Sequence, residues 1–537
     1  MQKLKTYIFI FVAVLFGSCG GDHSSKTENS AHKKTIFRYN QDVAVTSLDP
    51  AFAKMQSNIW AVDHLFNRLV ELDDNLNIIP AIAKSWTISD DGLVYTFSLR
   101  DDVFFHDNAA FSNGKGRKVT ANDIKYSYER LLAPETGSPG TWVFNGKLGP
   151  DPFKVVDEHT FQLTLSKPFR PMLGILSMHY LSIVPKEAIE KYGKSFRSHP
   201  VGTGPFKFKK WLENQSLFLT KNDHYFEKGL PYLDAIKVSF IGDKKTAFLE
   251  FMSGKLDFLA GIESSFVNEL LKSDGSLKSN LASKFNFQKN PFLNSEYLGI
   301  RMKMQDGSPL EKKKVRQALN YAIDRKQMLK SLRNNVGKPA NSGFTPIGLP
   351  SFNAEKVKGY TFNTDKASKL LAEAGYPNGK NFPEIKLQTT KSYLDICTFI
   401  TRQWNDIGIK VQIDVVEPAT LRNMMSKEQV PFFRGSWIAD YPDAENFFSV
   451  FYGKQPAPPN YTRFKNKKFD ALYEASIKEN DEAKRYNLYQ KMDQILVDEA
   501  PVIFLFYDET AQFSGKNISG LSKNAFNLLK LKQVKKN

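Results

Sequence analysis

The chain of 537 residues contains little cysteine and histidine, with two Cys and eight His. Because Cys19 lies near the amino terminus, the rest of the chain holds Cys397 alone, which excludes an internal disulfide and a Cys-x-x-Cys metal or redox motif. Ile396, Ile400 and Trp404 follow the spacing of a helix face beside Cys397. This pattern predicts a small buried side chain there and not a nucleophile.

The chain also lacks an apolar run long enough to span a bilayer at its amino terminus. Residues 7–16 are apolar but too few for a transmembrane helix, and they follow Lys3 and Lys5 and precede Gly17-Ser18-Cys19. This order resembles a bacterial lipoprotein signal, although Phe16 stands where Leu is commoner. The resemblance implies removal of residues 1–18, lipidation of Cys19 and a flexible tether over residues 19–34.

Motifs for catalysis, nucleotides and nucleic acids are missing as well. There is no G-x-S-x-G and no H-E-x-x-H, and the glycines of residues 202–204 are followed by Pro205, which does not fit a phosphate loop. His106 and Asp107 have no further ligand at metal spacing and are interpreted as a structural turn. The 74 Lys and Arg against 57 Asp and Glu give +17, but the charge is spread along the chain. We therefore expect no enzyme, no cofactor, no metal and no nucleic acid partner.

What is present is a regular alternation of strand and helix patterns over a length that suggests about three domains. Period-two alternation predicts strands near residues 95–99 and 158–166, and the order strand 385–389, helix 394–407, strand 409–416 predicts a parallel pair. Apolar residues from Val315 to Leu332 mark one face of a single predicted helix.

The segment from Trp437 to Phe448 places acidic residues in an aromatic and apolar run. A buried carboxylate is costly unless a cation or several donors meet it, so Asp440 is a candidate partner for a ligand's positive charge. A simpler interpretation is that Asp440 caps a helix that begins near Asp443. If residues 432–438 are extended, Arg434, Ser436 and Ile438 share a face with Asp440, and Arg434 could reach a ligand carboxylate or lie on the surface.

Several motifs resemble those of the solute-binding proteins of peptide-importing ABC transporters, the oligopeptide- and dipeptide-binding family. Residues 315–325, Val-Arg-Gln-Ala-Leu-Asn-Tyr-Ala-Ile-Asp-Arg, are the most specific match. Residues 80–86, 103–107, 120–127, 202–206 and 437–448 match further motifs in the same order, with Asn108 in place of the Gly that usually follows the second of these and Phe206 in place of Tyr. The resemblance covers roughly residues 36 to 510.

The resemblance implies an α/β fold of two lobes joined by a hinge, in the extended form with an additional α+β domain inserted in the first lobe. It places the first lobe at residues 33–79, 200–295 and 507–537, the insertion at 80–199 and the second lobe at 296–506. In the family the first Asp of the Trp-x-x-Asp-Tyr motif receives a peptide's α-ammonium group, which here is Asp440. The predicted ligand-binding set is Asp440, Arg434, Trp437, Ser436, Ile438, Tyr441 and Asn67.

The function implied is that of a lipid-anchored, exported monomer that captures peptides between two closing lobes and delivers them to an ABC permease and its ATPase. A binding protein of the same fold for another solute, such as an oligosaccharide, a nickel complex or haem, stays open, because fold does not fix function. A lipid-anchored hydrolase is the least favoured alternative.

Overall fold

The structure is a computed structural model that describes residues 34–261, 263, 266–304 and 307–537. The chain divides into two units, residues 1–34 and residues 35–537. The predicted signal, Cys19 and the tether as far as Lys33 lie outside the described residues.

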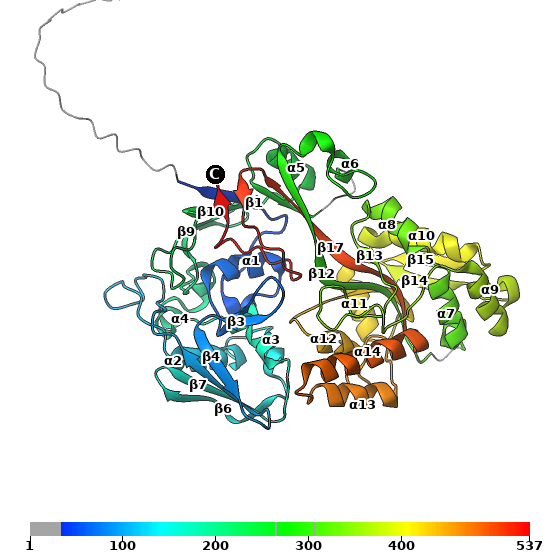
Figure 1. Cartoon of the computed structure of the whole chain (residues 1–537), viewed down its shortest axis with the longest axis horizontal. Helices are drawn as coiled ribbons and strands as arrows, with labels where there is room; N and C mark the ends of the chain where they lie inside the picture. Colours follow the sequence, from blue (N-terminus) through cyan, green and yellow to red (C-terminus); the bar gives the residue numbers. More distant parts are fainter. Residues whose placement is uncertain (1–33, 262, 264–265, 305–306) are drawn as a thin grey trace, which may run out of the picture. The chain divides into compact units, whose positions relative to one another are not determined.

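One eleven-stranded sheet runs through residues 35–537, in the order β15-β14-β16-β12-β17-β11-β1-β10-β9-β8 with β13 against β17 (Figure 1). The strands are β1 (Ile36–Asn40), β8 (Phe206–Leu212), β9 (Ser216–Lys221), β10 (Ala235–Ser239), β11 (Phe258–Ala260), β12 (Phe285–Ile300), β13 (Lys338–Pro339), β14 (Ile385–Thr389), β15 (Val411–Val415), β16 (Phe432–Ile438) and β17 (Val502–Gly515).

The two central strands are much longer than the others, with 16 residues in β12 and 14 in β17. They pair with each other along most of their length, and each also pairs with one outer group: β12 with β16, and β17 with β11. The antiparallel register shifts between Pro291 and Ser295 and again between Glu296 and Tyr297. The predicted lobe boundaries at residues 295 and 506 fall on these strands, and the limits of the lobes stay a prediction.

The predicted parallel pair is present, because β14 and β15 pair in parallel and are joined through α10 (Leu394–Asn405). Cys397 and Trp404 on this helix are fully buried, and Cys397 donates to the Thr389 hydroxyl at 3.3 Å. The prediction that Cys397 is a small buried side chain is confirmed, and burial raises the pKa of its thiol.

A separate antiparallel sheet lies within residues 83–165, in the order β4-β5-β7-β6. Its strands are β4 (Ala83–Ile88), β5 (Val94–Leu99), β6 (Leu148–Asp157) and β7 (Thr160–Leu165). Alternate side chains of β5 and β7 are buried, which is the pattern of a sheet covered on one face. The covering helix, α2 (Ala121–Leu132), begins with a capping box in which Thr120 and Asp123 satisfy each other's backbone donors.

Helices and short 3₁₀ turns cover the two sheets. The α-helices not yet named are α1 (Gln56–Leu65), α3 (Met172–Leu176), α4 (Lys186–Tyr192), α5 (Lys244–Met252), α6 (Val267–Leu270), α7 (Lys313–Tyr321), α8 (Arg325–Arg333), α9 (Thr364–Glu373), α11 (Pro418–Ser426), α12 (Glu445–Phe448), α13 (Lys467–Ser476) and α14 (Glu482–Glu499). The remaining strands are β2 (Val70–Leu72), β3 (Ile78–Pro80), β18 (Ile518–Ser519) and β19 (Lys535–Lys536).

The prediction of one helix from Val315 to Leu332 is wrong, because α7 ends at Tyr321 and α8 begins at Arg325. Asp324 accepts a hydrogen bond from the Gln327 amide at 2.9 Å and so caps α8. Apolar residues keep helical spacing through the break because both helices pack on the same core. The sequence signal for the break is Asp324, a residue type that caps helices, and the spacing of apolar residues does not reveal it.

The turn after β16 contacts the segment that carries α3. A methyl group added to Gly174 would lie 3.1 Å from the ring of Pro442, so the two segments are packed closely. Tyr441 is buried in the apolar cluster built mainly from residues 37–258. The carboxyl end of β16 therefore lies against the part of the chain that precedes β8.

Candidate functional site

A cavity of about 680 Å³ opens at the carboxyl end of β16. Its size is within the range of small-molecule sites, roughly 300–1,000 Å³. Its lining residues come from widely separated segments: Ala53, Lys54, Gln56, Ile59, Leu72, Pro139, Trp142, Ser177, Met178, His179, Tyr180, Phe292, Trp437, Ile438, Ala439, Asp440, Pro458, Tyr461, Phe526 and Leu528.

Asp440 is a carboxylate in this cavity without a cationic partner. By its accessible surface Asp440 is an exposed residue, but this surface lies in the cavity, where protein atoms from several segments surround the carboxylate. In the described part of the chain its side chain accepts one hydrogen bond, from the Asn446 amide at 3.2 Å, and takes part in no ion pair. Burial therefore raises the pKa of Asp440 to about 6, with the Asn446 contact opposing the shift.

Asn446 fixes the position of Asp440 and of the neighbouring Trp437. This asparagine is buried on α12, and its side-chain oxygen accepts hydrogen bonds from the Trp437 indole at 2.9 Å and from the Asp440 backbone amide at 3.1 Å. Asp440 does not cap α12, because Ala444 occupies the cap position. The helix-cap interpretation of Asp440 is therefore not what the structure shows.

His179 and Tyr180 line the cavity from a 3₁₀ turn, His179–Leu181. Burial and the charge of Asp440 raise the pKa of the Tyr180 phenol to about 12, which means that this phenol is neutral and lies near the carboxylate. His179 contacts Asp63 of α1, with 2.9 Å between Nε2 and the carboxylate. Two segments far apart in sequence therefore meet at the cavity, one carrying Asp440 and the other His179 and Tyr180.

The walls of the cavity are mainly aromatic and apolar, including Trp142, Phe292, Trp437 and Tyr461. Among the described lining residues the charged side chains are Lys54 and Asp440. Such a cavity accommodates a ligand that is mostly apolar or has a neutral backbone and that carries a positive group for Asp440. Lys54 offers a place for a negative group.

Of the predicted ligand-binding residues, Trp437, Ile438 and Asp440 line this cavity, and Ile438 is half exposed at its rim. Arg434, Ser436, Tyr441 and Asn67 are not among its lining residues. Tyr441 is buried and donates its phenol hydrogen to Glu445. Whether any of the seven contacts a ligand stays a prediction.

Arg434 points along β16 to an internal partner. Its guanidinium is 11% exposed and forms an ion pair with Glu296 of β12, which is 3% exposed. It also lies over the Tyr393 ring. Asn294 donates a second hydrogen bond to Glu296 at 2.9 Å. The guanidinium is thus neutralised within the protein.

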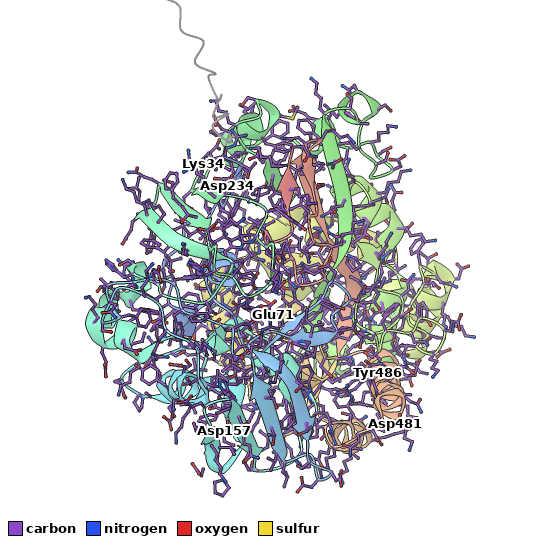
Figure 2. The ribbon with its side chains drawn as sticks, turned by 60° about the vertical axis from the view of Figure 1, so that its left-hand side comes forward. Lys34, Glu71, Asp157, Asp234, Asp481 and Tyr486 are labelled. Carbon is purple, nitrogen blue, oxygen red and sulfur yellow. The ribbon has the colours of Figure 1, made fainter. Side chains whose placement is uncertain are left out.

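Asn67 lies in a buried polar network next to α1. Its amide donates to Glu71 at 2.7 Å and to the Tyr225 phenol at 3.2 Å. Glu71 is buried and lies 3.4 Å from Lys532, and Figure 2 labels it near the centre of the view. The space beside this network is about 20 Å³, close to the volume that one water needs.

The structure contains no cluster of three or more His, Cys, Asp or Glu side chains arranged for a metal within the described residues. His106 lies in a buried turn, with Nε2 2.9 Å from the Gly204 carbonyl oxygen. In the same described ranges, none of the helices combines the length and the apolar character that a membrane span requires.

Sequence reasoning missed His179, Tyr180, Trp142, Tyr461 and Lys54 as cavity residues. Trp142 and His179 lie in short 3₁₀ turns, and Tyr461 follows the proline-rich segment 456–459, so none belongs to a periodic element. One sequence signal could have indicated these cavity residues. Large aromatic residues in irregular segments are not needed for the core of a chain that already has many regular apolar elements.

The central sheet shared by two groups of strands, with helices on its faces and a cavity at the junction, defines the class of two-lobe periplasmic binding proteins. The model of the bacterial extracellular solute-binding proteins, family 5 Middle, matches residues 77–459, and the chain belongs to this family.

Individual relatives agree with this assignment. The chain is 31% identical over 529 residues to heme-binding protein A of Haemophilus influenzae, covering 94% of this chain and 93% of that one. Among solved structures it is similar to HbpA2 from Haemophilus parasuis, with TM-score 0.81, 25% identity and coverage of 94% and 100%. It is also similar to the ABC transporter-associated periplasmic binding protein DppA from Helicobacter pylori in complex with the peptide STSA, with TM-score 0.75, 26% identity and coverage of 93% and 98%.

Proposed function

We propose that this chain is the substrate-binding component of an ABC importer that captures peptides in the cavity beside Asp440 and delivers them to a permease and its ATPase. The observation that carries the peptide assignment is the Asp440 carboxylate, which faces a largely apolar cavity without a cationic partner among the described residues. The α-ammonium group of a peptide supplies that charge. The similarity to DppA, solved with a peptide, supports the same ligand class.

We propose that closure of the two lobes around the ligand strengthens this interaction. In the open protein the carboxylate is hydrated, and on closure it exchanges that water for the ligand's ammonium group. Small-angle scattering should show a smaller radius of gyration with bound peptide than without it. An unchanged radius with demonstrated binding contradicts closure.

Calorimetry with trialanine and N-acetyl-trialanine tests the role of Asp440 directly. Removing one partner of a desolvated charge pair costs about 3–5 kcal/mol, so Asp440→Asn should weaken trialanine at least about a hundredfold. N-acetyl-trialanine lacks the positive charge and should bind the wild type weakly, with little further loss in Asp440→Asn. Asp395→Asn, which changes an exposed acid on α10, is the matched control and should bind as the wild type does.

The proposal fails if Asp440→Asn binds trialanine as tightly as the wild type. A purely structural role for Asp440 would instead lower thermal stability and weaken both peptides alike. Comparing the unfolding temperatures of the ligand-free proteins separates these two outcomes.

Haem is the second candidate, because the aromatic walls suit a flat macrocycle and the chain is similar to heme-binding protein A. Haem carries two acidic propionates, however, and an unpartnered carboxylate in the same cavity opposes them. Titration with haemin, followed by visible absorption, decides between the candidates. A saturable Soret shift that trialanine does not displace would favour haem.

Membrane attachment through Cys19 is also part of the proposal, and it rests on the lipobox-like sequence, which lies outside the described residues. Cys19→Ser should leave the protein without lipid and move it from the membrane fraction to the soluble fraction. A variant that stays with the membranes after a carbonate wash would exclude Cys19 as the anchor.

A further inference from the structure

His179 is a buried ring in the ligand cavity that the proposed ammonium site does not use. Its side chain is 10% exposed, and the residue lines the cavity. Nε2 lies 2.9 Å from the Asp63 carboxylate, and Arg68 lies 3.1 Å from the same carboxylate oxygen. Asp63 and Arg68 therefore hold the ring in one orientation.

The protonation state of this ring follows from its neighbours. Burial alone raises the pKa of Asp63, but the hydrogen bond from His179 and the charges of Arg68 and Lys530 outweigh it and hold that pKa well below its ordinary value. An ionised carboxylate only accepts hydrogen bonds, so Nε2 carries the hydrogen. Burial and the charge of Arg68 lower the pKa of His179, which leaves the ring neutral at pH 7 and Nδ1 as a lone-pair acceptor.

The lone pair of Nδ1 meets no hydrogen-bond donor among the described residues. In the described part of the chain no hydrogen bond reaches it. It also differs from His64 Nε2 and His106 Nδ1, which are sealed inside the protein without a partner, because it retains accessible surface. Since Nε2 faces Asp63 and the residue lines the cavity, the geometry points the accessible nitrogen toward the cavity.

The charges around His179 select the kind of group that it can accept. Arg68 and Lys530 both act on the ring, so the local potential is positive and disfavours a second cation. Asp440 and His179 line the cavity from different segments of the chain, so the two acceptors can serve different groups of one ligand. A neutral N–H donor fits these conditions, and a peptide presents one at each residue after the first.

We infer that His179 is a specificity-determining residue whose Nδ1 accepts a hydrogen bond from a backbone amide of the bound peptide. This inference rests on the proposed peptide function. An amide N–H that entered the cavity without an acceptor would lose its hydrogen bond to water, so the imidazole favours ligands with a free amide at this point. Asp63 and Arg68 are positioning residues, because they act through the ring.

The test uses the full-length protein with trialanine and its two backbone N-methyl derivatives. In the wild type, methylation of one of the two amides should weaken binding about fivefold to tenfold more than methylation of the other, since it removes the donor. In His179→Leu the same methylation should have no extra effect, and unmethylated trialanine should bind about fivefold to tenfold more weakly than it binds the wild type.

Two further variants keep the test decisive if His179→Leu folds poorly. The side-chain oxygen of Asn reaches the position of Nδ1, whereas Gln places its amide nitrogen at the position of Nε2, where it donates to Asp63. His179→Asn should therefore retain the sensitivity to methylation, and His179→Gln should lose it.

Equal effects of each methylation in the wild type, His179→Leu and His179→Gln would overturn the role of His179. This outcome differs from failure of the peptide function itself, in which trialanine does not bind the wild type or binds it independently of Asp440.

Discussion

Two acidic side chains, one on β12 and one just beyond the end of the neighbouring strand β16, are in opposite situations. Glu296 on β12 lies directly opposite Ser436 of β16 and is paired with Arg434, two residues earlier on that strand. Asp440 lies two residues beyond the end of β16 and is met by a single amide. The first carboxylate is closed off by the protein's own charge, whereas the second faces a cavity. The difference separates an acid that stabilises the fold from an acid available to a ligand.

Burial of both partners indicates that the Arg434–Glu296 pair matters for the fold. Burial raises the pKa of Glu296, Arg434 opposes this shift and Asp508 adds to it. Arg333 forms an ion pair with Asp508 at 2.6 Å, so a second guanidinium balances the second acid. Removing one member leaves the others with an uncompensated charge.

The largest effect is expected for Arg434→Met. Removing one partner of a buried pair costs about 3–5 kcal/mol, because Glu296 is left buried without its cation, and the free energy of unfolding should fall by an amount of this order. Chemical denaturation of the ligand-free protein measures it. Asp440→Asn is the matched comparison and should not lower this free energy, because its acid has no cation to lose and burial already disfavours its charge.

The double variant Arg434→Met/Glu296→Leu should recover most of the stability lost in Arg434→Met, since neither charge is then stranded. A different result for the single variant would contradict this interpretation. If Arg434→Met unfolds as the wild type does but loses affinity for trialanine, Arg434 contacts the ligand, as the sequence alone predicts. The contrast between Arg434–Glu296 and Asp440 then disappears.

The next effect in size is a pH dependence that only the unpartnered acid should give. An ammonium ligand needs the ionised carboxylate, and with a pKa of about 6 the ionised fraction of Asp440 falls from about nine-tenths at pH 7 to about one-tenth at pH 5. Affinity for trialanine should therefore fall about tenfold over this range, and calorimetry at several pH values measures it.

Asp440→Asn has no charge to titrate, so its residual affinity should vary much less between pH 7 and pH 5. The ligand-free stability should change in the other direction. The folded-state pKa is raised above the ordinary value of 3.8, so the contribution of Asp440 to stability is present at low pH and is lost as the pH rises through about 6. An affinity that stays constant from pH 7 to pH 5 would show that Asp440 does not meet the ligand's charge.

These contrasts also mark what the sequence could predict. The parallel pair β14 and β15 and the helix between them follow directly from periodicity, because each is a regular element with one buried face. Asp440 could be found because its signal is local: an acid inside an aromatic run. The partner of Arg434 could not, since Glu296 is 138 positions away and only the pairing of β12 with β16 brings the two together.

His179 was out of reach of the sequence for the same reason. Its role depends on Asp63, 116 positions away, and on a cavity wall formed by the segment after β16. A short 3₁₀ turn has no period from which the direction of a side chain can be inferred. Regular elements were therefore predictable, and contacts between distant irregular segments were not.

The smallest effect is expected for Asn446→Leu, which tests whether the site around Asp440 is held in place from behind. The substitution keeps a similar volume but removes the amide that donates to Asp440 and accepts from Trp437 and the Asp440 backbone. Loss of the single, long Asn446 hydrogen bond to the carboxylate corresponds to about 1 kcal/mol, so trialanine should bind about fivefold more weakly. The pH at which binding is half lost should move upward, because the Asn446 contact lowers the pKa of Asp440.

N-acetyl-trialanine should bind Asn446→Leu and wild type equally. If both peptides lose affinity by the same factor and the pH midpoint does not move, Asn446 supports the general packing of α12 and does not orient the carboxylate.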